Sequence, residues 1–125
     1  MTARLKAVHP VLPVRDVERA VRYYVDRLGF ALAFRDPSDP NGYAGVRRDD
    51  VELHLQWHAE EDFVGVEAGT MMLRLMVEDP DALFAEYCDR GVFHERTQLA
   101  DTPWGTREFA FFDLDGHGLT FYRDR

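Results

Sequence analysis

Hydrophobic and polar residues follow one pattern twice along the chain. Segments 14–27 and 77–90, which lie 63 positions apart, match in both apolar and charged positions. The matched pairs are Val14/Val77, Asp16/Asp79, Tyr24/Tyr87, Asp26/Asp89, Arg27/Arg90 and Phe30/Phe93. Such self-similarity decides the architecture, because each copy is one structural unit. Two copies predict two similar modules packed together.

Each copy predicts one helix. Asp16 and Asp79 stand where an N-cap accepts hydrogen bonds from free backbone N–H groups, and Pro80 follows at the first helical position. Gly29 and Gly91 are placed to end the helices. Apolar residues then recur at helical spacing, at Val17, Ala20, Val21, Tyr24 and Leu28, and at Leu83, Phe84, Tyr87 and Cys88. This spacing predicts that Cys88, the only cysteine, is a small buried residue.

Period-two alternation predicts four strands in each copy. In the first copy they lie near 7–14, 31–35, 42–47 and 51–57, and in the second near 71–77, 93–98, 107–113 and 118–123. In the segment 51–57, three apolar residues alternate with Glu52, His54 and Gln56. One face of each sheet therefore packs under a helix, while the other is polar and faces a cleft.

The chain thus reads as βαβββ, twice. We expect an α+β fold of two tandem modules whose curved mixed sheets surround a cleft, in one domain over residues 1–125. The first module covers about 1–59, a linker about 60–69, and the second module about 70–125.

Composition narrows the function. The 125 residues carry a net charge of −8, with 46% hydrophobic and 30% charged residues. An acidic chain repels phosphate backbones, so we expect no nucleic-acid partner, and no apolar run approaches the ~20 residues of a membrane span. The N-terminus lacks the hydrophobic region of a signal peptide, so we expect a cytoplasmic protein. A negative field favours a cationic small ligand, and the alternative is that the acidity only keeps the protein soluble.

Three segments resemble the vicinal oxygen chelate superfamily, which includes glyoxalases, extradiol dioxygenases and bleomycin resistance proteins. They are LPVRDVERAVRYYVDRLGF, FAEYCDRG and PWGTREFAFFDLDGHGLTFY, and the last is most similar to the bleomycin resistance branch. The resemblance implies a homodimer. In that branch the first strand is exchanged between protomers around a proline, and Pro10 stands in the corresponding place; a simple strand-start proline is the alternative.

The superfamily's enzymes hold a divalent metal, and the resemblance maps their ligand positions to His9, His54, Met72 and Thr120. Only the two histidines suit such a metal, because a thioether and a neutral hydroxyl are poor ligands for it. Glu52 would complete a set of His9, Glu52 and His54 if the register differed. We therefore expect no cofactor, with a divalent metal as the alternative. His58, His94 and His117 read as surface or turn residues.

The branch sequesters a bulky, flat, cationic glycopeptide between aromatic rings at the dimer interface. The positions matching its aromatic platforms are Phe34, Tyr43 and Trp104, with Trp57 as a further candidate and Glu52 as a source of negative charge. The resemblance thus implies a metal-independent protein that binds a bleomycin-like or other aromatic, cationic molecule and takes part in antibiotic resistance. The alternatives are a metal-dependent lyase, isomerase or dioxygenase, and a dimeric scaffold.

Overall fold

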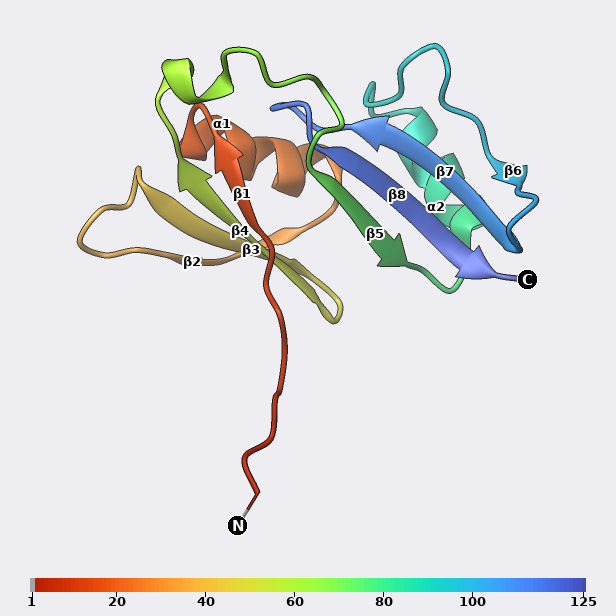
Figure 1. Ribbon diagram of the computed structural model, residues 1–125, viewed down its shortest axis with the longest axis horizontal. Coiled ribbons are helices and arrows are strands. Elements are labelled where there is room, and N and C mark those ends of the chain that lie inside the picture. The colour runs from red at the N-terminus through yellow and green to blue at the C-terminus, as the bar shows by residue number, and fades with distance from the viewer. Residues whose placement is uncertain (1) are drawn as a thin grey trace.

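The computed structural model describes residues 2–125 and contains the same order of elements twice (Figure 1). The first module holds β1 (Val11–Val14), α1 (Val17–Arg22) with a π-helical turn at Tyr23–Arg27, β2 (Ala31–Arg35), β3 (Tyr43–Arg48) and β4 (Val51–Trp57). The second holds β5 (Met72–Met76), α2 (Pro80–Cys88), β6 (Ala100–Asp101), β7 (Thr106–Phe112) and β8 (Gly118–Asp124). A 3-10 turn at Glu60–Phe63 lies between them. The predicted βαβββ duplication is confirmed.

Each module builds a four-stranded mixed sheet. Sheet A has the strand order β1-β4-β3-β2, and sheet B has the order β5-β8-β7-β6. In each sheet the first strand pairs with the last in parallel, and the other neighbours are antiparallel. The strands β1 and β5 lie toward the middle of the molecule, whereas β2 and β6 lie at its opposite ends (Figure 1).

The helices begin and end where the sequence predicts. The carboxylate of Asp16 accepts a hydrogen bond from the backbone N–H of Arg19, and Asp79 does the same for Ala82, each at 3.0 Å. The backbone at Gly29 and Gly91 has φ of 77° and 68°, in the left-handed region where glycine carries no Cβ penalty. Local sequence signals therefore mark both ends of each helix.

Tyrosine and arginine side chains hold the two modules together. The hydroxyl of the buried Tyr87 donates to the backbone carbonyl of Leu28 at 2.8 Å. The Arg48 guanidinium donates to both carboxylate oxygens of Glu86, at 2.8 and 2.9 Å, and to the same carbonyl at 2.8 Å. Two-point pairing of this kind fixes orientation as well as distance. The junction is therefore geometrically specified.

A second set of buried polar groups crosses the junction. The Tyr24 hydroxyl donates to Asp113 Oδ2 at 2.6 Å, and the Asp113 carboxylate also accepts from the backbone N–H groups of Asp115 and His117. Burial raises the pKa of the Asp113 carboxyl, against the lowering effect of His117 and these hydrogen bonds. The His117 Nε2 lies 2.6 Å from the carbonyl oxygen of Pro13. His117 is buried where it closes the turn between β7 and β8, so it is a turn residue but not a surface one.

Three other predictions need correction. The first strand begins at Val11 rather than near residue 7, and the N-terminal segment projects away from the body (Figure 1). No strand forms at 93–98 within the part of the chain described. Phe93 instead stacks on Phe84 with ring centroids 4.8 Å apart, and the following residues turn. Cys88 is exposed, because Leu83 and Tyr87 occupy the buried side of α2 and Cys88 lies beyond them.

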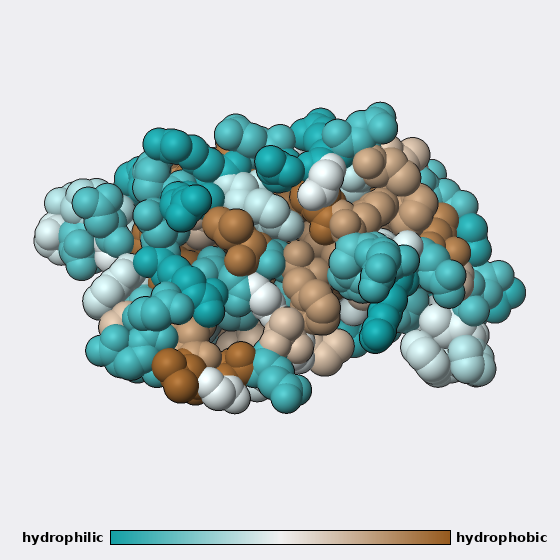
Figure 2. All heavy atoms as spheres, turned by 90° about the horizontal axis from the view of Figure 1, so that it is seen from above, coloured by the Kyte–Doolittle hydropathy of each residue, from teal (hydrophilic) through white to brown (hydrophobic). Residues whose placement is uncertain are grey.

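Hydrophobic side chains also reach the surface. Seen from above, the molecule shows hydrophobic atoms gathered in the middle of the face and toward one end, with hydrophilic atoms around them (Figure 2). Large exposed apolar residues include Val64, Val66, Met71, Phe112 and Leu114. Among residues 2–125, no helix has both the length and the apolar character required to cross a bilayer.

Candidate ligand-binding site

The side-chain alternation of β4 creates the polar face of sheet A. Leu53 and Leu55 point into the core and are 2% and 0% exposed, which leaves Glu52, His54 and Gln56 on the opposite face. This prediction is confirmed. The register pairs Tyr43 of β3 with Gln56 and Gly45 with His54, so β3 adds residues to the same face. We call this surface the groove face of sheet A.

A chain of hydrogen bonds runs along this face. The Tyr43 hydroxyl lies 2.7 Å from His54 Nδ1, and His54 Nε2 lies 2.9 Å from Glu52 Oε2. A carboxylate can only accept, so His54 carries its proton on Nε2, and Nδ1 accepts from Tyr43. The hydrogen bond from His54, together with the nearby His9 and Arg47, holds the pKa of Glu52 below its ordinary value. The face therefore keeps a negative charge.

An aromatic platform lies beside this chain. The Phe34 ring meets His54 edge-on at a centroid distance of 5.1 Å, and it stacks with Tyr43 at 6.1 Å and an interplanar angle of 27°. A Cβ at Gly45 would overlap the Phe34 ring, so the absence of a side chain there lets the ring lie across the strand. The structure thus brings together Phe34, Tyr43 and Glu52, three of the predicted ligand-binding residues.

His9 joins this cluster from the segment just before β1. Its ring stacks on His54 with centroids 4.9 Å apart and an interplanar angle of 20°, and its Nε2 lies 3.7 Å from Glu52 Oε2. Ligand atoms of His9, Glu52 and His54 all lie within 4.8 Å of one another. These are the three residues that the sequence offered as a possible metal set, and they fit a divalent metal in donor type.

Trp104 lies in the turn that joins β6 and β7 of sheet B, and it contacts residues that the sequence did not predict. Its indole Nε1 donates to Glu108 Oε1 at 3.2 Å, and the Thr106 hydroxyl donates to the same oxygen at 2.6 Å. The Arg74 guanidinium lies 3.3 Å from Glu108 and 4.3 Å from the ring centroid of Tyr122. The sequence signal that could have identified Glu108 is the alternation of polar and apolar residues in the predicted strand 107–113.

The environment keeps Glu108 charged. Burial alone would raise the pKa of its carboxyl, but hydrogen bonds from Thr106 and Trp104 and the charge of Arg74 lower it below the ordinary value. Trp104 itself is 67% exposed. Sheet B therefore also presents an accessible aromatic ring beside a carboxylate. We call Arg74, Trp104, Glu108 and Tyr122 the Trp104 cluster.

The two aromatic clusters lie far apart in one chain. Phe34 is in β2, at one end of the molecule, whereas Trp104 lies in the turn between β6 and β7, at the other end (Figure 1). One small ligand therefore cannot contact both within a single protomer. A groove that uses both requires sheet B of a second copy opposite sheet A of the first.

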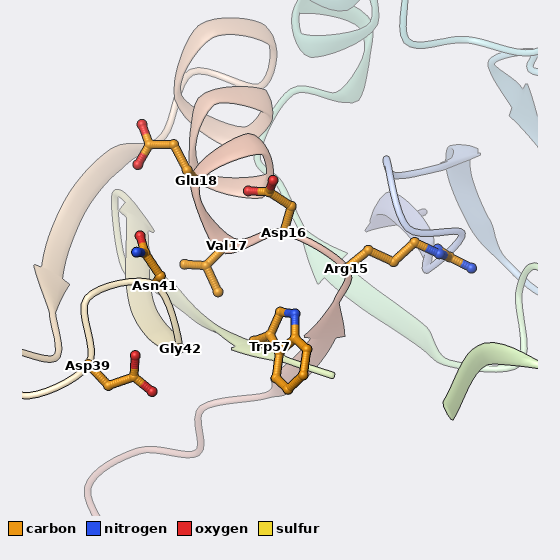
Figure 3. A pocket seen from close by; sticks show the side chains of 8 residues that line it. All are labelled: Arg15, Asp16, Val17, Glu18, Asp39, Asn41, Gly42 and Trp57. Atoms are coloured by element: carbon orange, nitrogen blue, oxygen red, sulfur yellow. The ribbon is translucent and has the colours of Figure 1, made fainter. Parts of the chain in front are cut away.

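Trp57 does not belong with the other candidates. Along β4 it has the same parity as Leu53 and Leu55, so it points to the helix side of sheet A. It lies in a separate, open hollow between the start of α1 and the loop before β3, with Asp16, Asp39 and Asn41 around it (Figure 3). The structure therefore corrects the assignment of Trp57 to the cleft.

The geometry defines a small α+β binding protein: two paired βαβββ modules, each with aromatic and acidic groups on an open sheet face. The chain belongs to the Glyoxalase/Bleomycin resistance protein/Dioxygenase superfamily, whose family model matches residues 6–121.

Individual relatives agree with this family. The chain is 31% identical to a bleomycin resistance protein of Geobacillus stearothermophilus over 128 residues, covering 91% of this chain and 93% of the relative. The bleomycin-binding protein of Streptomyces verticillus, solved with copper(II)-bleomycin, is 31% identical, with a TM-score of 0.78 and coverage of 96% and 97%. The bleomycin resistance determinant of transposon Tn5 shares the fold, at 23% identity, a TM-score of 0.79 and coverage of 97% and 99%.

Proposed function

We propose that this protein binds and sequesters bleomycin, or a similar flat and cationic antibiotic, in grooves between two copies of the chain. The observation that carries the proposal is that aromatic rings lie beside a charged carboxylate in both modules. Phe34 and Tyr43 lie beside Glu52 in the first module, and Trp104 lies beside Glu108 in the second. Aromatic faces stack on planar groups and attract cations, and nearby carboxylates strengthen that attraction.

Kinship supports the choice of ligand. The relatives with 31% identity across almost the whole chain are a bleomycin resistance protein and a bleomycin-binding protein. Sequestration requires affinity and no chemical step, so no catalytic group is needed. The cytoplasmic location expected from the sequence stays a prediction.

The N-terminal arm supports pairing of two copies. The side chains of Leu5 and Val8 are 99% and 90% exposed, and the arm projects away from its own body (Figure 1). Apolar side chains on an extended segment gain stability only when another surface covers them. We propose that Leu5 and Val8 pack on the second copy, while the Pro10 carbonyl, which accepts from the His54 N–H at 2.9 Å, anchors the base of the segment.

Calorimetric titration with bleomycin tests the function. We expect saturable binding with one ligand per chain, and no detectable binding would overturn the proposal. Trp104→Ala should weaken binding by about 1 to 2 kcal/mol, the scale of a stacking hot spot. Trp57→Ala is the matched control, because Trp57 lies outside the groove. This variant should bind bleomycin with the affinity of the native protein. Expression in a bleomycin-sensitive bacterium should raise the tolerated dose.

Light scattering tests the dimer. The native protein should have the mass of two chains, and a variant that lacks the first eight residues should shift toward the mass of one. A native monomer at the concentrations used for binding would contradict both the arm exchange and the shared groove.

A resident metal is the second candidate, and the spacing of His9, Glu52 and His54 favours it. These residues would hold a divalent ion, which when bound would act as a Lewis acid on a substrate oxygen. Met72 is a thioether, and Thr120 is buried and offers a hydroxyl, so sheet B adds no strong donor at the mapped positions. Metal analysis after exposure to zinc, nickel, manganese and ferrous iron separates the two candidates, because sequestration predicts far less than one ion per chain.

A further inference from the structure

The histidine cluster has one uncommitted donor. His54 uses both ring nitrogens, for Tyr43 and Glu52. Across residues 2–125, the His9 ring makes no hydrogen bond, and its Nε2 only approaches Glu52 at 3.7 Å. With the Nε2 proton directed toward that carboxylate, Nδ1 of His9 keeps a free lone pair. Stacking on His54 holds the plane of the ring.

The position of His9 suits a ligand rather than the core. Its side chain is 37% exposed, and it lines an open hollow of about 420 Å³ together with Glu52, Met72 and Arg74. The Phe34 and Tyr43 rings contact the same His54 ring edge-on, at centroid distances of 5.1 and 5.4 Å. A ligand with a planar group stacked on those rings would therefore lie within reach of His9 and Glu52.

We propose that the groove distinguishes the metal-loaded from the metal-free form of its ligand, with His9 Nδ1 binding a copper(II) ion that the ligand itself carries. The inference rests on the proposed function. A protein of the same family, 31% identical, binds bleomycin as its copper(II) complex, so this class of ligand brings its own ion.

The chemistry is a ligand exchange. Imidazole is a good ligand for copper(II), which prefers tetragonal coordination and holds axial ligands weakly. The lone pair of His9 Nδ1 forms one nitrogen–copper bond, one water molecule leaves the ion, and the oxidation state does not change. Glu52 lies on the other side of the ring, where it orients the imidazole and raises its basicity, as partners of metal-bound histidines do. Its negative charge also favours the added positive charge of the ion.

The cluster suits a metal ion that the ligand already chelates better than it suits a free ion from solution. One free imidazole beside an engaged histidine and carboxylate provides a single ready ligand, whereas holding a bare ion takes at least three. To capture bare copper, His54 and Glu52 would first have to break their mutual hydrogen bond. A chelated ion needs only one more donor.

Parallel titrations with metal-free bleomycin, copper(II)-bleomycin and copper(II) alone test the inference. We expect the copper complex to bind about tenfold or more tightly than the metal-free ligand, within the 10–100-fold range typical of groups that support metal binding. His9→Ala should remove this preference, so that the copper complex binds no more tightly than metal-free bleomycin does to the same variant. His58→Ala, which removes an exposed histidine outside the groove, should keep the preference.

Electron paramagnetic resonance separates coordination from simple charge attraction. Protein labelled with nitrogen-15 histidine should change the nitrogen hyperfine pattern of bound copper(II)-bleomycin, and His9→Ala should abolish that change. Equal affinity for the two bleomycin forms, or no effect of the label, would overturn the inference and leave the proposed function standing. Tight binding of copper(II) alone would also overturn it. Failure of both bleomycin forms to bind would overturn the proposed function itself.

Discussion

Arg27 and Arg90 bind across the module junction in a reciprocal way. Arg27 Nη1 donates to the backbone carbonyl of Arg90 at 2.8 Å, and Arg90 Nη1 donates to the carbonyl of Asp26 at 2.9 Å. These two arginines occupy equivalent positions in the sequence repeat. The repeat thus marks a pseudo-twofold relation between the modules, and Arg27 and Arg90 are among the residues that join them.

Tyr24 and Tyr87 are a second matched pair, but only Tyr24 donates to an acidic side chain, Asp113 at 2.6 Å. Tyr24→Phe should therefore lower the free energy of unfolding by about 1.5 to 3 kcal/mol, the range for a hydrogen bond to a charged group. Urea unfolding measures this change. Tyr122→Phe is the control, since no hydrogen bond of that hydroxyl occurs within residues 2–125, and equal losses in both variants would contradict the account.

Asp113 should make stability depend on pH. Its pKa is higher in the folded protein than its ordinary value of 3.8, so the folded state holds more protons than the unfolded state between those two values. Stability contributed by this group is present below the ordinary value and is lost as the pH rises through the raised one.

Asp113→Asn isolates this effect from the other carboxyl groups. The unfolding free energy of the native protein minus that of the variant should fall as the pH rises from about 3.8, the ordinary value of the carboxyl pKa. Chemical unfolding at a series of pH values gives the difference. If this difference stays constant or rises with pH, burial of Asp113 does not govern the pH dependence of the unfolding free energy.

Glu52 should contribute to the binding of cationic ligands. Because its pKa is lowered, the carboxylate stays charged down to acidic pH, and ligand affinity should decline only when the pH falls through that lowered value. Glu52→Gln should weaken bleomycin binding, because it removes the carboxylate charge that attracts a cationic ligand. Glu61→Gln removes the same charge from the linker and serves as the control. An equal loss of bleomycin affinity in this variant would show that net charge, and not the position of Glu52 in the groove, determines the effect.

Gly45 should matter because the Phe34 ring lies over it. Gly45→Ala places a Cβ where the ring is, so the ring must move, and both stability and ligand affinity should fall. In a Phe34→Ala background the same substitution should cost much less, giving a coupling of about 0.5 kcal/mol or more in a double-mutant cycle. Additive effects in thermal unfolding would show that the two residues do not contact each other in solution.

Repetition and alternation predicted most of the fold. Caps, breakers and period-two strands are local signals, so both helices, the strand 51–57 and the groove face of sheet A were found from sequence. Strand prediction failed at 93–98, where tertiary packing of Phe93 against Phe84 outweighs local strand preference. The prediction that Cys88 is buried on its helix also failed, because Leu83, Phe84 and Tyr87 make the contact of α2 with the sheet.

The site was only partly predictable. Phe34, Tyr43 and Glu52 come together because neighbouring strands put them on one face, which the alternation implies. Trp57 was misplaced, although its parity with Leu55 was readable in the sequence. The contact of His117 with the Pro13 carbonyl and the ion pair of Arg74 with Glu108 join distant segments, which no local pattern encodes.

The most direct test of a groove shared by two copies is a titration of mixed dimers. Phe34→Ala damages the sheet A face and Trp104→Ala damages the Trp104 cluster, so each variant alone should bind bleomycin weakly. After the two are unfolded together and refolded, the mixed dimer holds one groove with both native faces, and binding at native affinity should return at one site per mixed dimer. If the mixture binds no better than the separate variants, the groove does not combine sheet A of one chain with sheet B of another, and the central proposal is wrong.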